Sequence, residues 1–79
     1  MSEEDILERF RKCAVDVLSV EADQVTPGAK FGDDLDADSL DLVELVMALE
    51  EEFDISVDES ELEGIDTVGQ ALDLVKSKL

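Results

Sequence analysis

The N-terminal part of the chain repeats apolar residues at helical spacing. At about 100° per residue, one helix face takes Ile6, Leu7, Phe10, Cys13, Ala14, Val17 and Leu18, with Val15 outside it. Ser2 and Asp5 resemble a capping box with Asp in place of Glu. We therefore predict an amphipathic helix that starts after Ser2 and reaches Leu18, with Cys13 as a small buried core residue.

Helical spacing returns between Asp38 and Phe53, but here the apolar residues form two stripes. One stripe contains Leu42, Leu45, Val46, Leu49 and Phe53, and the other contains Leu40, Val43 and Met47, flanked by Glu44, Glu50 and Glu51. Two stripes are typical either of a helix with one face for the core and one for a partner, or of a helix buried more deeply than usual. The spacing alone does not decide between these two interpretations.

The C-terminal part predicts one short helix and one longer helix. Residues 54–66 place Ile55, Val57, Leu62 and Ile65 among acidic side chains, which fits a loop and a short helix ending near Gly64. Thr67 and Gln70 form a capping box. The buried stripe of the final helix is predicted to contain Val68, Ala71, Leu72, Val75 and Leu79. Lys76 and Lys78 lie in its last turn, where the helix dipole favours cations.

Residues 19–37 separate the first two long helices and include Pro27, Gly28 and Gly32. We expect a long ordered loop, anchored to the core by Val20, Val25, Phe31 and Leu35. No strand-like alternation is found in the sequence. The predicted fold is therefore all-α, a small four-helix bundle of three longer helices and one short helix, with a long loop between the first two.

Composition changes this picture mainly through charge. The 79 residues include 6 basic and 23 acidic side chains, for a formal charge of −17, and 44% of the residues are hydrophobic, too many for a disordered acidic tail. Without a basic face the chain is not expected to bind nucleic acid. An acidic N-terminus and a longest apolar run of only Leu45–Leu49 argue against a signal peptide and membrane insertion. With a single cysteine, these features predict a cytoplasmic protein.

The negative charge is concentrated in one part of the chain. Between Phe31 and Val75 there is no Lys or Arg, whereas 16 of the 23 acidic residues lie there. Such a charge run is commonly only a solvated face. Its coincidence with the second apolar stripe of 38–53 favours a surface that docks basic protein partners.

The sequence offers little for catalysis or metal binding. Histidine, the usual base for a serine or cysteine nucleophile and the commonest transition-metal ligand, is absent, so we do not expect ordinary hydrolase chemistry. Asp34, Asp36 and Asp38 alternate as in an EF-hand, but Ser39 and Leu45 stand where that loop needs Gly and Glu. We predict no dedicated metal site, while loose binding of divalent ions by the acidic cluster stays open.

Ser39 stands where the second long helix is predicted to begin. A serine beside an aspartate at such a position most often caps the helix, and the residues alone favour this interpretation. The same position also suits a covalently attached phosphate, because a helix N-terminus has free N–H groups and the positive end of the dipole.

The motif Asp38-Ser39-Leu40 opens a run that continues through Glu44 to Glu50-Glu51-Glu52-Phe53. This run closely resembles the acyl carrier proteins of dissociated (type II) fatty acid synthesis. The likeness extends from Phe31 and Leu35 before the motif to Thr67-Val68 after it, and implies a single acyl-carrier domain over residues 1–79. We expect a monomer.

The resemblance implies a phosphoprotein of lipid metabolism in which a separate transferase attaches 4′-phosphopantetheine from coenzyme A to Ser39. The thiol of this arm would carry the growing acyl chain as a thioester to the enzymes of fatty acid synthesis. The resemblance therefore implies a carrier that is not itself an enzyme. Carboxylates of the family's recognition helix meet Lys and Arg patches on transferase, synthase, reductase and dehydratase partners. The matching residues here are Asp38, Leu40, Asp41, Val43, Glu44, Met47, Glu50 and Glu51. The family also stores the acyl chain inside the bundle, with which this aliphatic core is compatible.

Two positions depart from the family pattern. Asp36 stands where Gly is common and adds a charge beside the attachment site, and Asp58 stands where Pro is common and leaves the shape of the preceding loop open. Two alternatives also remain. One is a stand-alone polyketide or aminoacyl carrier with the same Ser39 chemistry, and the other is an acidic helical interaction or calcium-responsive protein without a prosthetic group.

Overall fold

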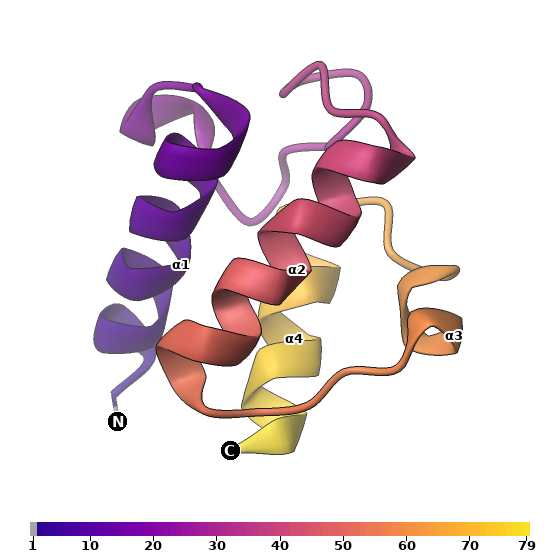
Figure 1. Ribbon diagram of the computed structural model, residues 1–79. Coiled ribbons are helices and arrows are strands. Elements are labelled where there is room, and N and C mark those ends of the chain that lie inside the picture. The colour runs from indigo at the N-terminus through magenta and orange to yellow at the C-terminus, as the bar shows by residue number, and fades with distance from the viewer. Residues whose placement is uncertain (1) are drawn as a thin grey trace.

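Three long helices form the body of the computed structural model, which describes residues 2–79 (Figure 1). They are α1 (Glu3–Leu18), α2 (Ser39–Phe53) and α4 (Val68–Lys78). Two short segments join them, the 3-10 helix η1 (Ala22–Gln24) and the helix α3 (Glu59–Leu62). The only β-type pairing within residues 2–79 is an isolated bridge between Lys30 and Thr67. The predicted all-α bundle of three longer helices and one short helix is confirmed.

Local capping signals set where α1 and α4 begin. The Ser2 hydroxyl accepts a hydrogen bond from the Asp5 N–H at 3.2 Å. Thr67 Oγ1 accepts from the Gln70 N–H at 3.2 Å, while Gln70 Oε1 accepts from the Thr67 N–H at 3.0 Å. These bonds satisfy N–H groups that have no partner inside the helix. The two predicted helix starts are thus confirmed.

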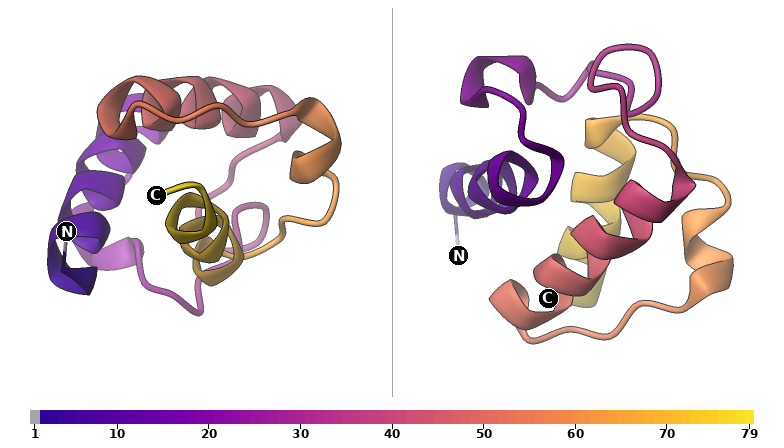
Figure 2. Two further views of the ribbon diagram at one scale, coloured as in Figure 1. Left: turned by 90° about the horizontal axis from the view of Figure 1, so that it is seen from below. Right: turned by 45° about the horizontal axis from the view of Figure 1, so that its top comes forward.

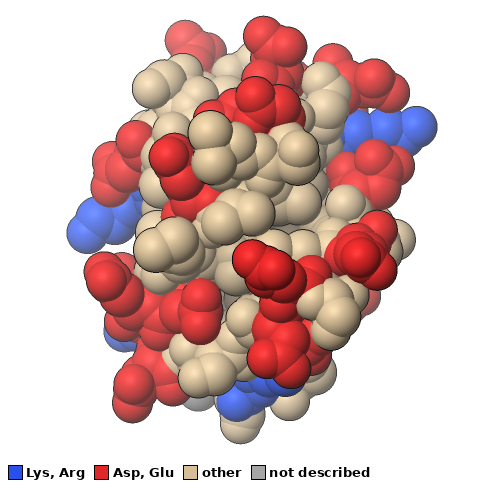
Figure 3. Space-filling model, turned by 45° about the vertical axis from the view of Figure 1, so that its right-hand side comes forward, with Lys and Arg blue, Asp and Glu red and all other residues tan. Residues whose placement is uncertain are grey.

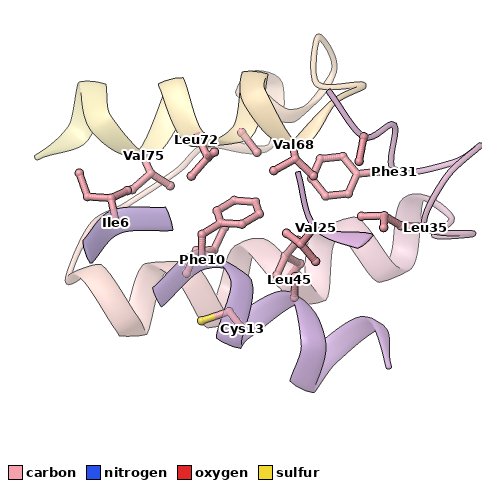
Figure 4. Close-up of a cluster of buried hydrophobic side chains, with 14 of the residues drawn as sticks. Ile6, Phe10, Cys13, Val25, Phe31, Leu35, Leu45, Val68, Leu72 and Val75 are labelled. Carbon is pink, nitrogen blue, oxygen red and sulfur yellow. The ribbon is translucent and has the colours of Figure 1, made fainter. Parts of the chain in front are cut away.

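The core draws on all three long helices and on the loop between α1 and α2 (Figure 4). Phe10, Val25, Leu45 and Val68 are completely inaccessible to solvent, and the predicted burial of Cys13 is confirmed. The buried hydrophobic residues are Ile6, Phe10, Cys13, Ala14, Val25, Ala29, Phe31, Leu35, Leu45, Val46, Leu49, Phe53, Val68, Ala71, Leu72 and Val75. Among the predicted anchors of the loop, Val20 is only partly buried.

One residue predicted for the core lies outside it. Leu79 was assigned to the buried stripe of α4, but its side chain is 52% exposed. Helix α4 ends at Lys78, so Leu79 follows the last turn and no longer shares the face that packs against α1. The prediction for Leu79 is wrong because the helical period was extended one residue too far.

The loop of residues 19–37 is fixed to the helices by hydrogen bonds as well as by buried side chains. Arg11 Nε and Nη2 both donate to the Val25 carbonyl, at 3.3 and 3.2 Å. Three backbone bonds join the loop to residues 66–69: Val68 N to Ala29 O at 2.9 Å, Gly69 N to Pro27 O at 2.8 Å, and Phe31 N to Asp66 O at 2.9 Å. The predicted long ordered loop is confirmed, and it holds the start of α2 in place.

The connection from α2 to α4 is built differently. Helix α3 has no buried residue, and Ile55 and Ile65 on either side of it are only partly buried against the core. Figure 2 shows α3 at the side of the molecule opposite α1, joined to α2 and α4 by extended segments.

Within residues 2–79 no helix has the length and apolar character needed to cross a membrane.

Candidate functional site

Two aspartates cap the start of α2. Asp38 is the N-cap residue, with an extended backbone, and its Oδ1 accepts from the Asp41 N–H at 2.9 Å. Asp41 Oδ2 accepts in return from the Asp38 N–H at 3.2 Å. This reciprocal pair is a capping box made of two aspartates. It fixes the direction in which α2 leaves the loop.

The expectation that Ser39 caps the helix is therefore wrong. Ser39 is the first residue inside α2, one position after the cap, because the carboxylate of Asp38 already occupies the capping position. The Ser39 side chain is exposed, and no hydrogen bond found among residues 2–79 involves its hydroxyl. The hydroxyl is consequently free for chemistry rather than committed to the helix.

The backbone just before this site turns through a left-handed residue. Asp36 has a φ of 53°, a conformation that glycine adopts without cost and that Asp and Asn tolerate better than most other residues. The Gly that the resemblance predicts at this position would adopt the same conformation without this cost. After the turn, the Ala37 N–H donates to the Phe31 carbonyl at 2.8 Å, which ties the approach to Ser39 back to a buried loop residue.

A hollow of about 340 Å³ lies beside Ser39. Its walls come from the loop, the start of α2 and the segment that includes the end of α3. The lining residues are Phe31, Gly32, Ala37, Asp38, Ser39, Leu42, Leu62, Glu63, Ile65 and Asp66. Apolar side chains from three parts of the fold thus meet next to the free hydroxyl.

The outer face of α2 carries the second apolar stripe. Leu40 and Met47 are 66% and 60% exposed, among the most exposed large hydrophobic residues of residues 2–79. Val43 is half-buried between them. The interpretation that α2 is buried more deeply than usual is wrong, since a buried helix would cover these two side chains.

The carboxylates around that stripe fall into two groups. Asp38 and Asp41 bond to each other's backbone, and the half-buried Glu50 accepts from the Val57 N–H at 3.2 Å through Oε2. Glu44 and Glu51 are exposed, and neither takes part in any hydrogen bond or ion pair found in residues 2–79. The latter two carboxylates are the ones most available to a partner.

Acidic side chains dominate the surface on this side of the molecule. Figure 3, which brings the side with α2 and α3 forward, shows red carboxylates spread around tan surface, with blue basic side chains at the margins. Three of the basic residues are held in ion pairs: Arg9 with Glu52, Lys76 with Glu3, and Lys78 with Glu61. The side of the molecule that α2 and α3 form is therefore predominantly negative.

Among residues 2–79, neither a reactive cysteine nor a metal site is found. Burial is the main cause that raises the pKa of the Cys13 thiol, with the charges of Glu52 and Asp16 adding to it, so the thiol stays protonated near neutral pH. Asp34 Oδ2 accepts from the Lys30 N–H at 2.7 Å. Among residues 2–79 no three acidic or cysteine side chains come close enough to hold a metal ion.

The residues at Ser39 fit a serine-linked phosphate that bears a chain. The hydroxyl is exposed and lies in the first turn of α2, whose N-terminal N–H groups and dipole favour a negative charge. The carboxylates of Asp38 and Asp41, which flank Ser39 in the sequence, accept hydrogen bonds from the backbone of the cap. The adjacent hollow offers apolar walls to whatever the phosphate carries.

Comparisons with known proteins agree with this geometry. Residues 8–75 match the family model described as "Phosphopantetheine attachment site". The chain is also 48% identical over all 79 of its residues to the "Acyl carrier protein" of Petrotoga mobilis, 93% of which is covered.

The chain therefore belongs to the acyl carrier protein family, which bears a phosphopantetheine attachment site. The resemblance recognised in the sequence is confirmed, as is the expectation of a carrier rather than a catalyst. Phosphopantetheine is the cofactor of this family, so the alternative of an interaction protein without a prosthetic group is wrong.

Sequence reasoning missed the far wall of the hollow. Leu62, Glu63, Ile65 and Asp66 lie more than 20 residues after Ser39 in the chain, and the fold brings them to it. Their sequence pattern indicated only a loop and a short helix. No local signal in that stretch points to Ser39.

Proposed function

We propose that Ser39 carries 4′-phosphopantetheine and that the chain delivers acyl groups, as thioesters on this arm, to the enzymes of fatty acid synthesis. The observation that supports this most is the free, exposed hydroxyl of Ser39 beside the hollow. Asp38 and Asp41 leave that hydroxyl unbonded by forming the cap themselves.

The chain contributes position rather than catalysis to the attachment reaction. The bond that forms joins Ser39 Oγ to the phosphorus nearest the pantetheine of coenzyme A, and the bond that breaks is the pyrophosphate linkage, which releases the nucleotide. The transferase must remove the hydroxyl proton, because the chain has no histidine and Asp38 Oδ1 is held by the Asp41 N–H. A bound arm supplies the thiol that forms the thioester.

Intact-mass measurement tests the attachment. After incubation with coenzyme A and a phosphopantetheinyl transferase, we expect the chain to gain the mass of one phosphopantetheine, and Ser39→Ala to gain nothing. Ser60→Ala is the matched control, because Ser60 is also an exposed serine in a helix, and it should be modified like the parent. No gain by the parent, or a gain by Ser39→Ala, contradicts the proposal.

We further propose that partner enzymes bind the outer face of α2 through basic patches. The partner-binding residues would be Asp38, Leu40, Asp41, Val43, Glu44, Met47, Glu50 and Glu51. The exposure of Leu40 and Met47 supports an apolar centre for this contact, and the free carboxylates of Glu44 and Glu51 support an acidic rim. Asp38, Asp41 and Glu50 also stabilise the chain's own fold, so their substitution would affect more than docking.

Charge reversal at Glu44 tests this surface. For Glu44→Lys we expect the rate of association with the transferase to fall roughly three- to tenfold at low salt, with a weaker salt dependence, because exposed charges act mainly on encounter. Asp73→Lys is the control, since Asp73 is exposed on α4 and changes the net charge equally. Equal effects of the two substitutions in stopped-flow binding would argue for net charge alone.

The pathway requires a separate test. A polyketide or aminoacyl carrier would use Ser39 in the same way, and the name of the Petrotoga mobilis relative favours an acyl cargo. We expect protein purified from its native cells with the thioester intact to carry saturated and 3-oxygenated acyl chains. An aminoacyl or methyl-branched polyketide cargo on the arm would contradict the assignment to fatty acid synthesis.

A further inference from the structure

One carboxylate, that of Glu61, both caps α3 and ties it to the end of α4. Glu61 Oε1 pairs with Lys78 Nζ at 2.8 Å, and Glu61 Oε2 accepts from the Asp58 N–H at 2.9 Å. The hydrogen bond from Lys78, followed by that from the Asp58 N–H, lowers the pKa of Glu61, and Glu61 correspondingly raises the pKa of Lys78. A proline at position 58 would lack the N–H that makes the second bond.

Helix α3 depends on such ties because burial gives it little support. None of its four residues is buried. Leu62, at its end, and Ile65, shortly after it, are only half-buried. The residues from Leu62 to Asp66 form the far wall of the hollow beside Ser39. Any outward movement of α3 therefore widens that hollow.

A second lysine two residues away provides an internal comparison. Lys76 pairs with Glu3 at 3.1 Å and so joins α4 to α1, on the side away from the hollow. Lys78 joins α4 to Glu61 of α3, next in the chain to Leu62, which lines the hollow. The two pairs involve the same kind of charge on the same helix but restrain different parts of the fold.

We propose that the Lys78–Glu61 ion pair is a latch that holds α3 against α4, and that its strength sets how often the hollow opens to a chain carried on Ser39. The claim that the ion pair controls access to the hollow rests on the proposed function. The claim that it holds α3 against α4 does not. About 30% of each side chain is exposed, 31% for Lys78 and 30% for Glu61. The latch is consequently weak enough to open often, and salt should loosen it.

Amide hydrogen exchange on the unmodified full chain tests the latch directly. For Lys78→Met we expect the Glu61 and Ile65 amides, which bond to Asp58 O and Leu62 O, to exchange roughly two- to fivefold faster, the range of an exposed ion pair. Lys76→Met should leave these amides unchanged. No acceleration with Lys78→Met, or an equal one with Lys76→Met, overturns the latch.

A double-variant cycle separates the pair from simple charge effects. Glu61→Gln keeps an oxygen to accept from the Asp58 N–H but removes the charge that pairs with Lys78. We expect Glu61→Gln and Lys78→Met each to accelerate exchange and their combination to add nothing further. Fully additive effects would overturn the latch. If the two residues act through one ion pair, either substitution already breaks that pair, and the second substitution has nothing further to remove.

The effect on cargo is measured on the chain with an acylated arm on Ser39. We expect hydroxylamine to cleave the thioester of Lys78→Met roughly two- to fivefold faster than that of Lys76→Met, in line with the amides. Equal cleavage rates would overturn the link between the latch and the hollow. If Ser39 cannot be loaded at all, the proposed function fails, while the amide experiments on the unmodified chain still decide whether the latch exists.

Discussion

The two connections that border the hollow beside Ser39 differ in how they are held. Residues 19–37 insert completely or almost completely buried side chains such as Val25 and Phe31 into the core. They also share three backbone hydrogen bonds with residues 66–69. Residues 54–65 bury nothing fully and are tied by the carboxylates of Glu50 and Glu61.

Under the proposed function, the difference matches what a carrier needs on each side of Ser39. The fixed loop positions the cap of α2 and hence Ser39, which under the proposed function each partner enzyme must find in the same place. The loosely tied segment forms the far wall of the hollow, and under the proposed latch its movement gives a chain access to the hollow without disturbing the serine. One connection, residues 19–37, thus fixes the position of Ser39, and the other, residues 54–65, controls access to the hollow.

The largest effect is expected from a matched pair of valine substitutions. Val25→Ala should destabilise the fold by about 2 kcal/mol, because it removes two buried methyl groups and leaves a cavity. The Tm should fall by roughly 8 to 16 °C. Val57→Ala, at a half-buried position, should cost less than about 1 kcal/mol by the same measure. Equal losses in thermal unfolding would contradict the contrast between the two connections.

A smaller effect is expected from glycine-to-alanine substitution, with opposite signs at Gly69, where α4 contacts the fixed loop, and at Gly64 in the loosely tied segment. A Cβ at Gly69 would lie 2.8 Å from the Pro27 carbonyl oxygen, so Gly69→Ala should destabilise by about 1 to 2 kcal/mol as the loop shifts away from α4. A Cβ at Gly64 would meet nothing within 4 Å, and Gly64→Ala should raise stability slightly by restricting the unfolded chain. Denaturant titration of both variants checks the signs, and a neutral Gly69→Ala would show that the loop is not held closely.

Much of the helical core and of the fixed loop, residues 19–37, could be predicted from the sequence. The period of apolar residues predicted the core faces of α1, α2 and α4, and the isolated apolar residues predicted the loop anchors, because burial leaves a regular pattern in the chain. The identity of the α2 cap was predicted wrongly. Asp38 and Asp41 have the same spacing as Ser2 and Asp5, so the signal for a capping box was present in the sequence.

The ion pair that holds α3 and the hollow beside Ser39 could not be predicted in the same way. The pair of Lys78 and Glu61 joins residues 17 positions apart, and its formation depends on where α4 ends relative to α3. The hollow combines Phe31, Leu42 and Ile65 from three separate elements. Such tertiary juxtapositions leave no local period or capping signature.

Residue-resolved hydrogen exchange on the unmodified chain tests the central contrast most directly. The amides of Phe31, Val68 and Gly69 bond across the junction of the loop with α4, and we expect them to exchange only by near-global unfolding. The amides of Ile55, Val57 and Ile65 should exchange at least about tenfold faster, through local opening around α3. Equal protection of the two groups would contradict the account that Ser39 lies between a fixed connection and a movable one.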